Sequence, residues 1–89
     1  MKLSDRFIMR TVADESILIP IGDAALSVKG LIVLSESGAL LCEKLKNGAE
    51  RDELVSTLLD EYDVSPDEAA RDTDEFLSSL RGHGMIVEE

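Results

Sequence analysis

The sequence predicts an α+β fold in which a three-stranded antiparallel sheet is followed by three helices. Segments rich in β-branched residues fill the first third of the chain, whereas the remainder shows the apolar spacing of amphipathic helices. The clearest local signal is Ser65-Pro66-Asp67-Glu68, in which an N-cap serine precedes a proline at the first helical position and the glutamate completes a capping box. A hairpin followed by helices is the order of a winged helix-turn-helix. We therefore expect one such domain over residues 1–89.

The first two strands are predicted to form a hairpin. Residues 6–13 and 16–21 are rich in β-formers, with Asp14-Glu15 as the turn between them. Ile17, Ile19 and Ile21 share one face of the second strand. Pro20 has no N–H to donate, which indicates that this strand ends at a sheet edge.

Residues 29–34 form the most strand-like segment of the chain. Alternation places Leu31 and Val33 on one face and Ile32 and Leu34 on the other, so both faces are apolar. A sheet with one face in water shows a polar face instead. We therefore expect helices to cover one face and a partner or further helices to cover the other.

Three helices follow this strand. The first begins at Ser35 or Ser37 and runs to about residue 46, with Gly48 as the stop; the second covers residues 49–63. The third begins at Pro66 and runs to about Arg81. Its predicted inner stripe is Ala69, Thr73, Phe76 and Leu80. Residues 85–87 are apolar and β-prone, and either add a short strand or pack under the third helix.

The net charge of −10 is concentrated in one region. Residues 50–75 hold eleven acidic and two basic side chains, a difference of −9. Such a surface repels nucleic acids and anionic membranes, and serves either as a solvated face or as a contact for a basic partner. A single cysteine, no apolar signal region and no apolar run of membrane-spanning length indicate a cytoplasmic protein.

The sequence offers little that could act as a catalyst. His83 stands between two glycines at a helix end, where it suits the helix dipole, and nothing near Cys42 in sequence would lower its pKa. One His and one Cys cannot form a structural zinc site, and no glycine-rich phosphate loop is present. We expect no enzyme activity, no cofactor and no metal.

Three functions fit the predicted architecture. A winged helix that reads DNA is disfavoured because its third helix is acidic, with five acids against one base: Asp67, Glu68, Asp72, Asp74 and Glu75 against Arg71. A second possible role is that of an acidic scaffold that dimerises through the third strand. The third is a peptide-binding module, in which an extended guest adds to the edge of the third strand beside the third helix.

Three segments of the chain resemble the PqqD-like family of RiPP recognition elements. They are G-L-I-V-L-S-E-S-G-A at 30–39, E-L-V-S-T-L-L-D-E-Y-D-V at 53–64 and D-E-A-A-R-D-T-D-E-F-L-S-S-L-R-G-H-G-M-I at 67–86. The resemblance implies a winged helix-turn-helix fold and a chaperone for a precursor peptide. Such a protein binds the leader of a ribosomally made precursor and presents it to a modifying enzyme, often a radical SAM enzyme.

The resemblance also implies where the leader binds. The guest strand is expected along the third strand, at Gly30, Leu31, Ile32, Val33 and Leu34. On the third helix, the residues expected to face the peptide are Ala70, Asp74, Leu77, Ser78 and Arg81. Asp74 and Arg81 would contact charged leader residues, and Leu77 would either touch the peptide or pack in the core. We expect a monomer or a weak homodimer.

Overall fold

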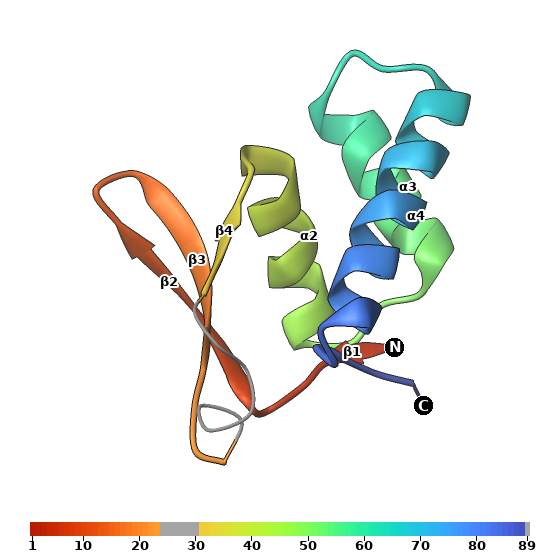
Figure 1. The fold of residues 1–89 in the computed structure, drawn as a ribbon. Coiled ribbons are helices and arrows are strands. Elements are labelled where there is room, and N and C mark those ends of the chain that lie inside the picture. The colour runs from red at the N-terminus through yellow and green to blue at the C-terminus, as the bar shows by residue number, and fades with distance from the viewer. Residues whose placement is uncertain (24–30, 89) are drawn as a thin grey trace.

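The computed structural model describes residues 1–23 and 31–88. A three-stranded antiparallel sheet consists of β2 (Phe7–Val12), β3 (Glu15–Pro20) and β4 (Ile32–Leu34), in the order β2-β3-β4. Three helices follow: α2 (Glu36–Lys46), α3 (Arg51–Glu61) and α4 (Pro66–Gly82). In Figure 1 the sheet lies on one side of α2, and the α3–α4 pair lies on the other. The predicted α+β fold is confirmed.

A second, two-stranded sheet joins the two ends of the chain. β1 (Lys2–Leu3) pairs antiparallel with β5 (Ile86–Val87), and the N and C labels accordingly lie close together in Figure 1. The predicted short strand near residues 85–87 is therefore present. Its partner β1 was not predicted, because two residues give no alternation to detect.

The hairpin between β2 and β3 turns one residue earlier than predicted. Val12 pairs with Glu15, so the two-residue turn is Ala13-Asp14 and not Asp14-Glu15. Both turn residues have positive φ, 51° and 68°, as a type I′ turn requires. Aspartate tolerates this conformation better than alanine does, so the strain falls mainly on Ala13.

The helix starts follow from their caps. The Ser35 hydroxyl accepts the Gly38 N–H at 3.1 Å, and the Ser65 hydroxyl accepts the Glu68 N–H at 3.1 Å. The second helix begins at Arg51 and not at residue 49. Glu50 is its N-cap, and the buried Ala49 before it instead bonds Met1 through both its N–H and its carbonyl.

The core lies between the inner face of the sheet and the three helices. It is aliphatic, as the composition predicts. Its largest fully buried apolar side chains are Leu18, Leu41, Leu45, Leu54, Leu77, Leu80 and Met85. Because α2 supplies two of these leucines from the middle layer, it fixes the distance between the sheet and α4.

Candidate functional site

Strand β4 forms one edge of the three-stranded sheet. Its register pairs Leu34 with Ser16 and Ile32 with Leu18, and no other described strand pairs with it. Leu34 is buried and Ile32 half-buried against the helices, whereas Val33 is 58% exposed on the opposite face. The predicted alternation is confirmed. Helices cover the inner face, and among the described residues nothing covers Leu31 and Val33.

The hairpin fixes which peptide groups of β4 point toward the open edge. The Ile21 N–H donates to the Arg6 carbonyl at 2.7 Å, so the odd-numbered residues of β3 bond to β2. Residues Ser16 and Leu18 therefore direct their peptide groups toward β4. Their partners Leu34 and Ile32 point back at β3, and the N–H and C=O of Val33 point toward the open edge.

A close contact between α2 and α4 lies beside this edge. A side chain at Gly38, in the first turn of α2, would meet Phe76 Cε1 at 3.1 Å and Leu34 Cδ2 at 3.7 Å. Gly38 therefore lies against both β4 and α4. Phe76 of α4 therefore lies against the first turn of α2, at the point where α2 follows β4.

A cleft opens between the start of α2 and the facing parts of α3 and α4. It consists of two adjoining hollows of about 290 and 280 Å³ that share Ser35, Ser37, Leu58 and Asp72. Its apolar lining is Leu41, Leu58, Tyr62, Val64 and Phe76. Ser35, which directly follows β4, lines both hollows, so the cleft begins where the strand ends. We call these two hollows together the β4 cleft.

The β4 cleft has an acidic rim. Asp72 borders both hollows, Glu75 the first and Glu36 the second. Burial, followed by the carboxylates of Glu36 and Glu61, raises the pKa of the Tyr62 phenol. The cleft therefore combines an apolar floor with negative charge at its opening.

The structure places the predicted site residues in several environments. Leu31, Ile32, Val33 and Leu34 lie along the open edge, and Gly30 falls outside the described residues. On α4, Ala70 is half-buried and Ser78 is exposed. Arg81 is held by Glu88 through an Nε–Oε1 contact of 2.6 Å.

Two predicted α4 residues do not lie beside β4. Leu77 is 1% exposed and belongs to the core. Asp74 points toward α3, where Arg51 donates to both of its carboxylate oxygens at 2.6 and 2.9 Å. These hydrogen bonds lower the pKa of Asp74 and raise that of Arg51. Leu77 therefore follows the core-packing alternative and Asp74 is engaged by α3, while peptide contact by the α4 set stays a prediction.

On the opposite flank of α4, residues that were not predicted to face a peptide border the β4 cleft. Asp72 and Glu75 border the β4 cleft, and Phe76, which was predicted as core, is half-buried there. Gly38 permits the approach of Phe76 to α2. A glycine in the first turn of a helix was the available signal, because glycine weakens a helix unless a neighbour needs the space.

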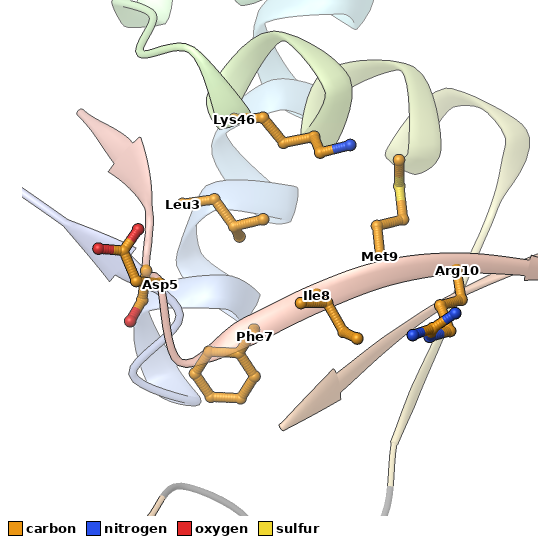
Figure 2. A pocket seen from close by; sticks show the side chains of 8 residues that line it. Leu3, Asp5, Phe7, Ile8, Met9, Arg10 and Lys46 are labelled. Atoms are coloured by element: carbon orange, nitrogen blue, oxygen red, sulfur yellow. The ribbon is translucent and has the colours of Figure 1, made fainter. Parts of the chain in front are cut away.

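The sheet has a second edge, at β2, and a larger hollow beside it. This hollow, of about 530 Å³, is lined by apolar side chains and by Asp5, Arg10 and Lys46. Figure 2 shows Met9 rising from β2 toward α2, near the side chain of Lys46. The two edges therefore differ in charge, since two cations border the β2 hollow and carboxylates border the β4 cleft.

The single cysteine and the single histidine line neither the β4 cleft nor the hollow beside β2. Cys42 is fully buried in α2, and burial raises the pKa of its thiol to about 12. The His83 Nδ1 lies 2.8 Å from the Ser79 carbonyl at the end of α4. Across residues 1–23 and 31–88, no group of three or more His, Cys, Asp and Glu side chains has metal-binding geometry. No described helix is long and apolar enough to cross a bilayer.

Comparison with known proteins gives the family. The protein-family model described as coenzyme PQQ synthesis protein D (PqqD) matches residues 17–86. The chain belongs to the PqqD family. No curated protein matches it. The match begins within β3 and ends within β5, so it covers the strand edge and the β4 cleft together.

Two solved structures share the fold. One is described as TbiB1 in complex with the TbiA(beta) leader peptide; it is 24% identical, with a TM-score of 0.81 over 100% of this chain and 98% of that one. The other is lasso peptide synthetase B1 complexed with the leader peptide, 21% identical, with a TM-score of 0.78 over 98% of this chain and 96% of that one. Both similarities extend over whole chains, so no large segment of the fold lacks a counterpart.

Proposed function

We propose that this PqqD-family protein is a non-catalytic chaperone that binds the leader of a ribosomally made precursor peptide. The leader adds as a fourth strand to β4, beside α4, and the protein presents the remainder of the precursor to a modifying enzyme. The observation that carries the proposal is the open edge of β4 beside the β4 cleft. The two chains of like fold, which hold leader peptides, support the same ligand class.

Strand addition suits the composition of the site. Each main-chain hydrogen bond contributes about 0.5–1.5 kcal/mol net, without regard to the guest's sequence. Apolar pockets beside the edge then select the side chains that face the helices. The Val33 peptide group supplies the hydrogen bonds, and the cleft lined by Phe76 and Leu58 supplies the selection.

The enzyme partner we propose is a radical SAM protein, on the family resemblance of the sequence. A separate binding protein is useful to such an enzyme because affinity for the leader need not be built into the catalytic cleft. The acidic exposed faces of α3 and α4 weigh against a DNA-binding role, since carboxylates repel phosphates.

Titration of ¹⁵N-labelled protein with the leader peptide encoded beside its gene tests the proposal. We expect amide shifts along residues 31–34 and on α4, largest at Val33 and around Phe76. The absence of shifts in both regions would exclude leader binding at this site. Shifts confined to β2 would instead place the guest at the other edge of the sheet.

A further inference from the structure

Each hollow of the β4 cleft is, by itself, smaller than a typical ligand pocket. The two hollows, about 290 and 280 Å³, lie at the lower limit of the roughly 300–1,000 Å³ typical of ligand pockets. The first hollow is floored by Leu41, Leu58 and Phe76. The second is bordered by Tyr62 and Val64. Each hollow is therefore suited to one large side chain of an extended peptide.

The carboxylates of the rim have no cation to balance them within the described part of the chain. The ion pairs there engage Glu43, Glu50, Asp52, Asp74 and Glu88. Glu36, Asp72 and Glu75 take part in none of them. A guest that brings a cation to this rim removes the repulsion among three like charges.

The strand geometry sets the spacing of the guest's contacts. A guest residue opposite Val33 exchanges main-chain bonds and points its side chain away from the helices, as Val33 does. The guest residue opposite Leu34 points toward the helices and thus toward Gly38 and Phe76. The next guest residue on that face lies two positions away, because side chains alternate along a strand.

We propose that the β4 cleft selects leader segments with an aliphatic residue and a lysine or arginine two positions apart. This inference rests on the proposed function and names the chemistry of its ligand. The aliphatic side chain enters the first hollow against Phe76. The stem of the basic side chain crosses the apolar border formed by Tyr62 and Val64, and its charged end reaches Asp72 and Glu36.

Selection from a display library of random 12-residue peptides tests the inference without knowledge of the natural precursor. The immobilised protein is the wild-type chain, the cleft variant Glu36→Gln/Asp72→Asn, or the control variant Asp14→Asn/Asp60→Asn. Both variants change the net charge by the same amount. Asp14 and Asp60 are exposed and do not line the cleft, so the control corrects for general attraction of basic peptides.

Among the peptides that wild type and control enrich, the inference predicts an aliphatic and a basic residue two positions apart. Among the peptides that the cleft variant enriches, it predicts that this pattern is absent. Synthetic copies of the selected peptides should bind the cleft variant about 2- to 10-fold more weakly, with a smaller difference at high salt. Enriched peptides with aliphatic anchors but no basic partner, or an unchanged pattern in the cleft variant, would overturn the inference and leave the proposed function intact. If Val33→Pro enriches the same peptides as wild type, binding does not use the β4 edge, and both proposals fail.

Discussion

Replacing Val33 with proline tests the proposed strand addition at a single peptide group. The alternation of hydrogen bonds directs the Val33 N–H toward the open edge of the sheet, where a guest strand would accept it. Proline removes this donor and places its ring where the guest backbone would lie. The bonds of Ile32 and Leu34 to β3 do not involve that N–H. The change therefore acts on the guest and not on the sheet.

The expected loss of affinity follows from one main-chain hydrogen bond. At about 0.5–1.5 kcal/mol, its removal weakens binding roughly 2- to 12-fold, and the proline ring adds to this by holding the guest away. The fold should lose little stability, because the Val33 side chain is 58% exposed and proline is tolerated on an edge strand. Fluorescence anisotropy with a labelled leader peptide measures the affinity, and urea denaturation measures the free energy of unfolding.

Two controls separate the edge from the side chain. Val33→Thr keeps the N–H and the branched shape, so it should bind the leader nearly as wild type does. Thr11→Pro is the matched change at the other edge, since the same alternation directs the Thr11 N–H away from β3. This variant should fold and bind normally.

Three results would refute the reasoning. Equal leader affinities for Val33→Pro and Val33→Thr would show that the Val33 N–H makes no bond to the guest. Loss of binding in Thr11→Pro alone would place the guest at β2. Unfolding of Val33→Pro, with Ile32→Pro still stable, would show that the hydrogen-bond alternation assigned to β4 is reversed.

Three further changes test other parts of the structure. Gly38→Leu should fill the β4 cleft, because a Cβ there already meets Phe76 at 3.1 Å. Leader binding should weaken at least roughly tenfold while the helical circular dichroism is retained, and unchanged affinity would exclude the cleft as a contact. The Arg51 contact holds the pKa of Asp74 below its usual value, so it stabilises the fold above about pH 4 and is lost as pH falls through the lowered pKa. Denaturation curves of Asp74→Asn should therefore differ from wild type at pH 7 and converge with it in acid; a constant difference would contradict this. The Cys42 thiol, with its pKa raised to about 12, should react with a disulfide reagent at pH 8 only as fast as the protein opens, and rapid reaction of the native protein would show that it is accessible.

The sequence was sufficient to predict those elements whose signals are local. Ser65 and Pro66 mark the start of α4, and the Ser65 side chain caps it as predicted, whereas the capping box recorded in the described chain is that of Glu50 and Glu53 at α3. The pairing of β1 with β5 was out of reach, because it joins two-residue segments more than 80 positions apart. Its formation depends on α4 returning the chain to Met1, whose ammonium group donates to the Ala49 carbonyl. Such pairing is a consequence of packing and leaves no local pattern.

The peptide-facing side of α4 shows a different limit of sequence reasoning. Periodicity correctly placed Ala69, Thr73 and Leu80 in the core, but a buried stripe has two flanks that the 3.6-residue repeat does not distinguish. One flank meets α3, where Arg51 binds Asp74, and on the other flank Phe76 meets the first turn of α2. The choice between them depends on how α4 crosses α2, and the contact that reveals it is Phe76 against Gly38. Because that contact joins residues 38 positions apart, only the folded chain identifies the acidic flank as the one that borders the β4 cleft.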